Sequence, residues 1–127
     1  MISSWLVVLN KNTKKVLILK RSDSSNNRGK WDFPGGSTKG LKSHRKLIYK
    51  ETLQEIGIRP TKLSFIYSVR RKNKKYHYYM YFVKEDILPT LSHEHSDFKW
   101  VKIYKLKYLK KLHLSVKVFI NLFYNHN

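Results

Sequence analysis

The chain contains no cysteine, which excludes disulfides, thiolate nucleophiles and zinc–thiolate sites and fits a reducing, cytoplasmic location. It also lacks any apolar run approaching the roughly 18 residues of a membrane span, so no membrane partner is expected. The opening stretch "MISSWLVVLN" is apolar, but it has no basic segment before it and no small-residue cleavage pattern. We therefore interpret it as a first strand and not as a signal peptide.

Acidic residues are scarce, because 8 Asp and Glu stand against 27 Lys and Arg and leave a formal net charge of +19. A surface with this charge attracts polyanions such as nucleic acids, nucleotides and anionic membranes. An abundance of lysine, asparagine, tyrosine and isoleucine is also what an AT-rich coding sequence produces, in which case the charge serves solubility. Both interpretations stay open, because charge alone does not name a partner.

The apolar content is sufficient for a compact core, since 41% of the 127 residues are hydrophobic, and the chain fits one domain over residues 1–127. Apolar runs separated by polar turns predict most of the strands. The predicted strands are 4–10, 15–21, 63–71, 75–84 and 97–103, with 31–36 as a short extended piece.

Two regions have helical character. Ser43 is suited to cap a helix and Gly57 to end it, and the apolar residues between them are expected to form its buried stripe. Those residues are Leu47, Ile48, Leu53 and Ile56. Apolar spacing within 105–125 predicts one or two closing helices. The fold class is therefore α+β, or a small α/β sandwich.

Two carboxylates share one face of the first predicted helix. Glu51 and Glu55 are one turn apart, and Gln54 follows Glu51 by three residues. Oxygen ligands of this kind suit Mg²⁺, which takes its remaining ligands from phosphates and water. The glycine pair Gly35 and Gly36 before the helix lets backbone groups approach a metal or a phosphate. A Glu pair at this spacing is also common on exposed helices, so the pattern needs support from the rest of the chain.

That support comes from "GSTKGLKSHRKLIYKETLQEIGI", which resembles the signature G-x5-E-x7-R-E-U-x-E-E-x-G-U of the Nudix hydrolase family, where U is a bulky aliphatic residue. Five of its nine fixed places agree: Gly36, Glu51, Glu55, Gly57 and Ile58. The other four differ, with Lys42 for Glu, Lys50 for Arg, Thr52 for the aliphatic residue and Gln54 for Glu. The flanking segments "VLILKR", "KWDFPGG" and "SHEHSDFKWV" resemble the family as well, so the likeness covers about residues 5–103.

The resemblance implies an α/β/α sandwich with a mixed sheet, a central catalytic helix and a C-terminal helix. It also implies cleavage of a diphosphate linkage in a nucleotide or nucleotide-linked substrate, with Mg²⁺ or Mn²⁺ as cofactor. Glu51 and Glu55 would be metal ligands, with Gln54 and the backbone of Gly36 beside them. The general base would be Glu51 or Glu94; a metal-bound carboxylate is the poorer base, which leaves room for Glu94. The resemblance also leaves a homodimer as an open expectation, because many members of the family are dimers.

Several cations are candidates for substrate binding. Arg21 is a candidate phosphate clamp, because a guanidinium can hold two oxygens at once; a solvated strand-end charge is the alternative. Lys42 and Lys50 stand near the expected phosphates, and Lys50 could also orient Glu51. With Gln54 in place of a carboxylate, we expect weak metal binding until substrate phosphates add negative charge. His93 and His95 flank Glu94, and we interpret both as loop histidines and not as metal ligands.

The segment "RRKNKK" forms a predicted hairpin tip with five cations: Arg70, Arg71, Lys72, Lys74 and Lys75. They could hold the backbone of an RNA substrate, or they could form a solvated turn. The tyrosines of "YHYYMYF" could stack on a base, but we interpret them as core.

The main prediction is a Nudix-type pyrophosphohydrolase. The alternatives are a weak or inactive module that binds RNA or nucleotide, and a scaffold for protein interaction.

Overall fold

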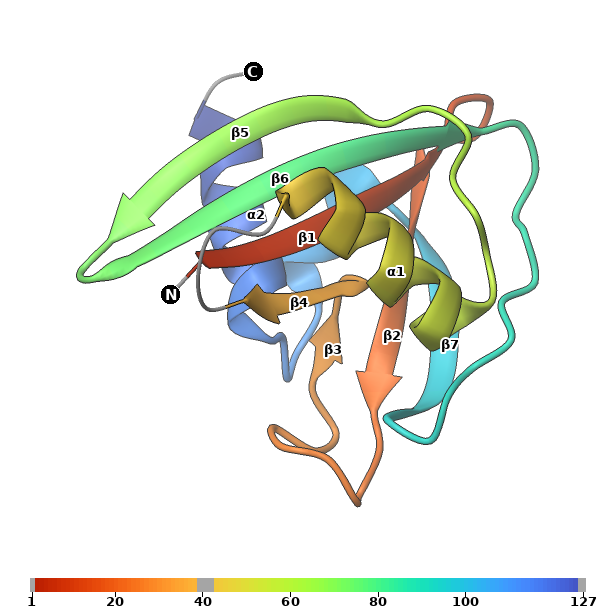
Figure 1. Ribbon diagram of the computed structural model, residues 1–127. Coiled ribbons are helices and arrows are strands. Elements are labelled where there is room, and N and C mark those ends of the chain that lie inside the picture. Colours follow the sequence, from red (N-terminus) through yellow and green to blue (C-terminus); the bar gives the residue numbers. More distant parts are fainter. Residues whose placement is uncertain (1, 39–42, 126–127) are drawn as a thin grey trace.

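The computed structural model describes residues 2–38 and 43–125. A mixed sheet separates helix α1 (His44–Ile56) on one face from helix α2 (Leu114–Asn125) and the short 3-10 helix η1 (Ile103–Tyr108) on the other (Figure 1). The predicted α+β sandwich with a mixed sheet is therefore confirmed. Of the described helices, none is both long and apolar enough to cross a membrane.

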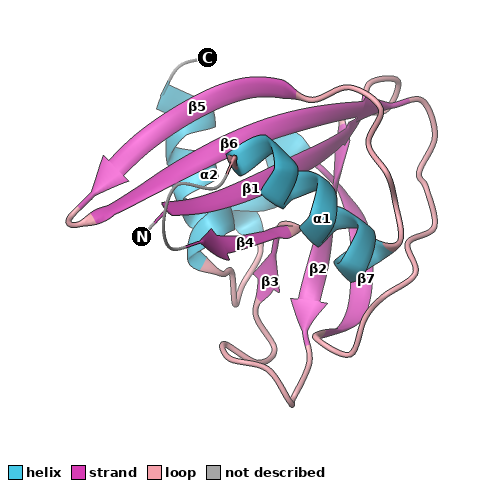
Figure 2. Ribbon diagram, in the orientation of Figure 1, coloured by secondary structure: helices cyan, strands magenta, loops and turns pink. Residues whose placement is uncertain are grey.

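The strands lie close to their predicted positions, with ends that differ by no more than two residues for the five full-length strands. They run in the spatial order β3-β2-β1-β6-β5, with β4 paired to β1 and β7 paired to β2. The pair β1 and β6 is parallel, and the other pairs are antiparallel. The strands are β1 (Ile2–Asn10), β2 (Lys15–Arg21), β3 (Trp31–Asp32), β4 (Gly35–Thr38), β5 (Ser64–Arg71), β6 (Lys74–Val83) and β7 (His95–Lys102) (Figure 2).

Strand β1 supplies both cores of the sandwich, because successive side chains of a strand point to opposite faces of the sheet. Trp5 and Val7 belong to the core under α2, whereas Leu6 and Val8 belong to the core under α1. Strand β6 follows the same rule, with Tyr78 in the first core and Tyr79 in the second. The interpretation of the tyrosine-rich strand as core is thus confirmed for its buried members.

Helix α1 begins and ends as its sequence predicts. The Ser43 hydroxyl accepts a hydrogen bond from the Lys46 N–H, and Gly57 adopts the left-handed φ of 71° that ends many helices. The predicted buried stripe is wrong in part, because Leu53 is 39% exposed. The buried face consists of Ile48, Thr52, Glu55 and Ile56. A threonine and a glutamate thus occupy positions that an apolar pattern assigns to the core.

Candidate functional site

Glu55 lies buried between α1 and the glycine pair of β4. Its side chain is only 4% exposed, and its Oε2 accepts a hydrogen bond of 3.1 Å from the backbone N–H of Gly35. Gly35 has a φ of 148°, and a Cβ atom added there would lie 2.1 Å from the carbonyl oxygen of Ser4. Only glycine therefore allows β4 to approach β1 this closely while its N–H faces the carboxylate.

The strand register decides which glycine turns its backbone toward the carboxylates. Residues of an antiparallel pair alternate between exchanging hydrogen bonds and directing their backbone groups outward. The N–H of Leu6 bonds to the Pro34 carbonyl at 2.8 Å, and Ser4 pairs with Gly36 two residues further along. This alternation turns the backbone of Gly36 toward β1 and that of Gly35 outward. Gly35, not the expected Gly36, therefore presents its backbone groups at this edge.

Glu51 lies one turn before Glu55 and over Gly36. A Cβ atom added to Gly36 would lie 3.4 Å from the Cδ of Glu51. This half-buried carboxylate therefore packs directly against the strand at Gly36. The predicted arrangement, two acids one turn apart next to a double-glycine bend, is present in the structure.

Glu94 is brought to the same place by the loop before β7. The N–H of Ser92 bonds to the Glu55 carbonyl at 3.2 Å, and the N–H of Ser22 bonds to the Glu94 carbonyl at 2.9 Å. These bonds join the loop to the end of α1 and to the end of β2. The Glu94 carboxylate itself has no hydrogen-bond or ion-pair partner among residues 2–38 and 43–125, and it borders a polar hollow of about 270 Å³ with Arg21 and His93.

A buried polar chain that sequence reasoning missed ends beside Glu55. The Oδ2 of Asp32 accepts from Arg21 Nη1, and its Oδ1 accepts from His95 Nε2, both at 2.9 Å. The His95 Nδ1 lies 4.0 Å from Glu55 Oε1 and has no other partner in the described structure. The interpretation of His95 as a loop histidine is therefore wrong, because it is the buried first residue of β7. His93 is exposed in the loop, as expected.

The acids of this cluster repel one another. Burial raises the pKa of Glu55 to about 9, and the negative charges of Asp32, Glu51 and Glu94 add to the shift against the opposing Gly35 hydrogen bond. Burial also raises the pKa of Glu51, with a further rise from Glu94 and a reduction from the positive charge of Lys50. Carboxylates that raise one another's pKa in this way are stabilised in their charged form by a cation placed among them.

The donor set fits a divalent cation that is completed from outside the protein. Within the described residues, no three His, Asp or Glu side chains form a ready-made metal site. Mg²⁺ commonly takes only one or two protein carboxylates and fills its octahedron with phosphate oxygens and water. Glu51, Glu55 and the outward backbone of Gly35 match that requirement in residue type and in position.

The other predicted site residues have mixed outcomes. Gln54 is exposed on α1, and its amide forms no hydrogen bond with another described residue. Lys50 is exposed on the outer face of α1, yet near enough to Glu51 to lower its pKa. The Arg21 guanidinium donates hydrogen bonds to Asp32 and to the Asn26 carbonyl, so its role as phosphate clamp stays a prediction. Lys42 lies outside the described residues.

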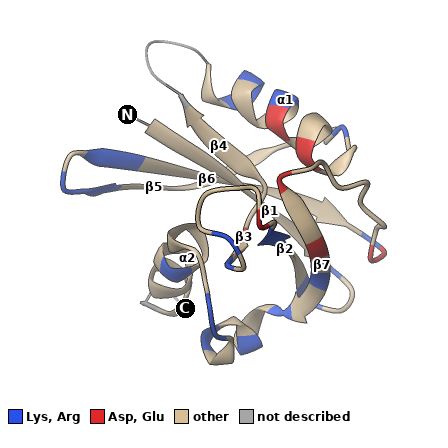
Figure 3. Ribbon diagram, turned by 90° about the horizontal axis from the view of Figure 1, so that it is seen from below, with Lys and Arg blue, Asp and Glu red and all other residues tan. Residues whose placement is uncertain are grey.

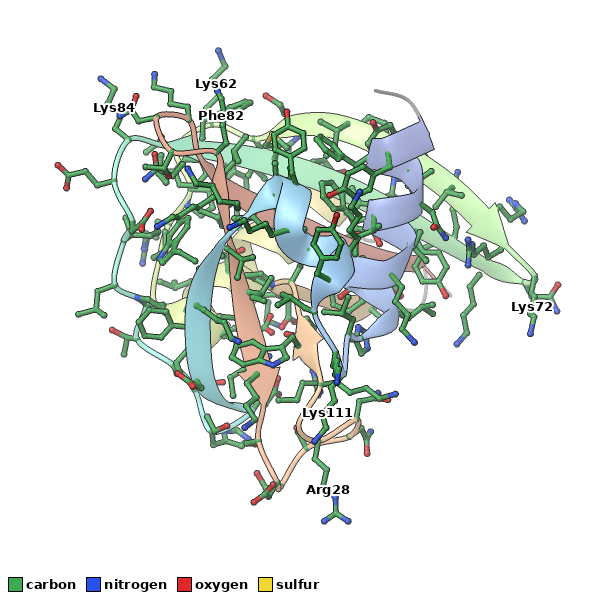
Figure 4. All side chains as sticks on the ribbon, turned by 180° about the vertical axis from the view of Figure 1, so that it is seen from behind. Arg28, Lys62, Lys72, Phe82, Lys84 and Lys111 are labelled. Carbon is green, nitrogen blue, oxygen red and sulfur yellow. The ribbon has the colours of Figure 1, made fainter. Side chains whose placement is uncertain are left out.

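The basic hairpin (residues 70–75) is present, with its turn at Lys72 and Asn73. Its tip points away from the body of the molecule, where Figure 4 labels Lys72. Figure 3 shows that the acidic residues lie on the α1 and β7 side, at a distance from this end of β5 and β6. The hairpin cations therefore do not contact the carboxylate cluster.

A pocket on the opposite face of β4, here called the inner pocket, has a volume of about 260 Å³. Ser37, which follows Gly36, lies in its wall, and the Ser37 hydroxyl is 2.7 Å from the Ser3 hydroxyl. Trp5, Tyr76 and His113 supply aromatic surface, and no described residue accepts a hydrogen bond from Trp5 Nε1. The pocket and the carboxylate cluster thus lie on either side of one edge strand.

Comparison with known proteins agrees with this geometry. A family model described as NUDIX domain matches residues 2–123. The CTP pyrophosphohydrolase of Escherichia coli K12 is 27% identical over 88 residues, which are 68% of this chain and 65% of that protein's length. The MutT protein of Methanosarcina mazei Go1 has a TM-score of 0.74 and 28% identity over 100% of this chain and 94% of its own. The NUDIX domain of Shewanella oneidensis NrtR complexed with ADP ribose has a TM-score of 0.73 and 16% identity over 98% and 85%.

Proposed function

The chain belongs to the NUDIX family, and on that premise we propose that it is a metal-dependent pyrophosphohydrolase acting on a nucleotide or nucleotide-linked diphosphate. The observation that carries the proposal is the convergence of Glu51 and Glu55 on the Gly35–Gly36 bend, with Glu94 close enough to raise the pKa of both. The CTP pyrophosphohydrolase relative and the neighbour bound to ADP ribose support a nucleotide-linked substrate. A cytoplasmic location is part of the proposal.

Glu51 and Glu55 would hold the cation with help from the outward backbone of Gly35. A bound Mg²⁺ or Mn²⁺ supplies charge neutralisation at the phosphate oxygens. Glu94 accepts the proton of the attacking water, because its carboxylate is close to the cluster and has no described partner of its own. The water oxygen bonds to phosphorus while the anhydride bond breaks. The Gly35 N–H holds the Glu55 carboxylate, and His95 lies behind it with Nδ1 4.0 Å from Oε1. His95 and Asp32 do not touch the substrate.

The inner pocket is the proposed place for the nucleoside. Its aromatic wall offers stacking surface, and the hydroxyls of Ser3 and Ser37 offer hydrogen bonds to a heterocycle. A nucleoside there would direct its 5′ phosphates around the edge of β4 toward Glu51. Arg21 lines the polar hollow beside Glu94, and its guanidinium retains N–H donors for a phosphate oxygen.

The test is hydrolysis of nucleoside triphosphates, sugar nucleotides, dinucleoside polyphosphates and capped RNA with Mn²⁺ or Mg²⁺. Glu51→Gln and Glu55→Gln should each lower kcat by about 100-fold or more, since each removes a charged ligand. Glu85→Gln, an exposed acid of the loop after β6, is the matched control and should leave kcat unchanged. No metal-dependent hydrolysis of any substrate by the folded wild type would overturn the proposal.

A second candidate is a binding module with little or no catalysis. It is favoured by the departures from the family signature at Lys42, Lys50 and Gln54, since the first and the last replace carboxylates and so reduce the negative charge available to a cation. This alternative predicts salt-sensitive RNA or nucleotide binding that survives Glu51→Gln and Glu55→Gln. Hydrolysis that depends on both acids would exclude it.

A further inference from the structure

A second pocket, here called the hairpin pocket, lies between the tip of the basic hairpin and the first residue of α2. It has a volume of about 470 Å³ and is lined by Arg71, Lys72, Asn73, Lys74, Tyr76 and Leu114. Three of its six lining residues are cations, and none is an acid. A pocket of this composition favours a phosphate or another compact anion over a neutral or cationic group.

The two pockets share one wall. Lys74, Tyr76 and Leu114 line both the inner pocket and the hairpin pocket. Tyr76 is a β6 residue, and Leu114 is the first residue of α2, so the shared wall is built on two regular elements. A ligand whose base and sugar fill the inner pocket would therefore meet Lys74 and then Arg71 on its way out.

Like charges face each other across the two strands of the hairpin, which destabilises it. The strand register places Arg70 opposite Lys75 and Arg71 opposite Lys74. Like charges directly across an antiparallel pair repel each other. Residues 56–84 contain no Asp or Glu, and none of the described ion pairs involves the hairpin. A polyanion bound along this wall would remove the repulsion, whereas a merely solvated turn has no need of paired cations.

We propose that the hairpin pocket binds the phosphodiester that follows the first nucleoside, so that the preferred substrate is a 5′-triphosphorylated RNA end and not a free nucleotide. The inference rests on the proposed function and names its substrate. Water attacks phosphorus in the 5′ triphosphate, and the anhydride bond between the α and β phosphates breaks. Pyrophosphate is released, and the RNA chain keeps a 5′ monophosphate. The hairpin takes no part in that step. It binds the next phosphate and thereby lowers KM for a chain.

The experiment compares ATP with the dinucleotide pppApA and a 5′-triphosphorylated five-residue oligoadenylate. The test variant is Arg71→Gln/Lys72→Gln in the hairpin pocket. The control is Lys105→Gln/Lys110→Gln, which makes the same change of charge at exposed positions of η1 and the loop after it, outside both pockets. Wild type should have a KM for pppApA lower than that for ATP by about tenfold, which two partly exposed charge contacts can supply. The hairpin variant should lose that difference at unchanged KM for ATP, and the control should keep it.

Equal KM values for ATP and pppApA in wild type, or an equal loss for both in the hairpin variant, would overturn the inference. Binding separates this result from a failure of the proposed function. Fluorescence anisotropy with the oligoadenylate, labelled at its 3′ end, is measured on Glu51→Gln with and without the two hairpin substitutions. Hairpin-dependent binding without hydrolysis by wild type would support the RNA site and overturn the hydrolase. Binding that ignores the hairpin would overturn the RNA site whatever the activity.

Discussion

The backbone N–H of Gly35 donates a hydrogen bond of 3.1 Å to the Oε2 of Glu55. The bond joins the edge strand β4 to the buried face of α1. It holds the carboxylate at the bend where we propose that the cation and the diphosphate meet. Because Gly35 lies so close to Ser4, the whole arrangement depends on the absence of a side chain at this position.

Gly35→Ala should therefore lower the stability of the folded protein. Its Cβ would lie 2.1 Å from the Ser4 carbonyl oxygen, and its φ of 148° is strained for alanine. We expect a loss of about 2–4 kcal/mol in the free energy of unfolding, measured by urea denaturation. Gly29→Ala is the control, because Gly29 also has a positive φ but nothing within 4 Å of an added Cβ. Equal losses for the two variants would show that the close contact is unimportant.

His95→Phe should also destabilise the fold. The change removes the donor to Asp32 Oδ1 and leaves that oxygen buried without its partner. We expect a loss of about 1–3 kcal/mol in the free energy of unfolding, by the same denaturation assay. His93→Phe, two residues earlier and exposed, should change stability by no more than about 0.5 kcal/mol. A His95 variant as stable as wild type would argue against the buried polar chain.

The sequence predicted the elements of this fold well, because strands and helix ends depend on local patterns and caps. It misjudged the buried face of α1 for a physical reason. Leu53 is more hydrophobic than Thr52 or Glu55, but the latter two face the sheet and the glycine bend. An apolar pattern cannot recognise a core-facing carboxylate that is held by a backbone N–H from another strand.

The chain from Arg21 through Asp32 to His95 was missed for a related reason. Its members come from β2, β3 and β7, and only the pairing of these strands brings them together. A hint existed in the aspartate of "KWDFPGG", since an acid between a tryptophan and a phenylalanine needs a partner when it is buried. The sequence also could not tell that Gly35, and not Gly36, directs its N–H at Glu55, because the direction of a backbone group follows from strand register.

Stability should depend on pH through His77. Its ring stacks on His44 with centroids 4.6 Å apart, and neither ring nitrogen has a partner in the described structure. Burial, followed by the positive charges of His44 and Lys75, lowers the pKa of His77 below its ordinary value of 6.5. The unfolded chain thus takes up the proton first, so stability is lost as the pH falls below 6.5 and is retained above it.

Replacing His77 by phenylalanine keeps a ring in the stack and removes the titration. The free energy of unfolding, measured between about pH 8 and pH 5, should fall less in His77→Phe than in wild type. His93→Phe serves again as control and should follow wild type. A wild-type and a His77→Phe curve of equal slope would contradict the assignment.

Gln54→Glu should strengthen metal binding, because it restores a negative charge on the turn that carries Glu51 and Glu55. We expect the dissociation constant for Mn²⁺ to fall by about tenfold, corresponding to about 1.4 kcal/mol. Leu53→Glu, which adds the same charge at the neighbouring exposed position, is the control for a general electrostatic effect. Equal gains in the two variants would place Gln54 outside the metal site.

The most direct test of the account is Mn²⁺ binding to the folded protein, followed by electron paramagnetic resonance, with and without a non-hydrolysable nucleotide. We predict weak binding to wild type alone, binding at least about tenfold tighter with the nucleotide, and loss of that gain in Glu55→Gln but not in Glu85→Gln. Binding that is tight without nucleotide, or that is the same in Glu55→Gln as in wild type, would contradict the claim that Glu51 and Glu55 hold a cation against a diphosphate.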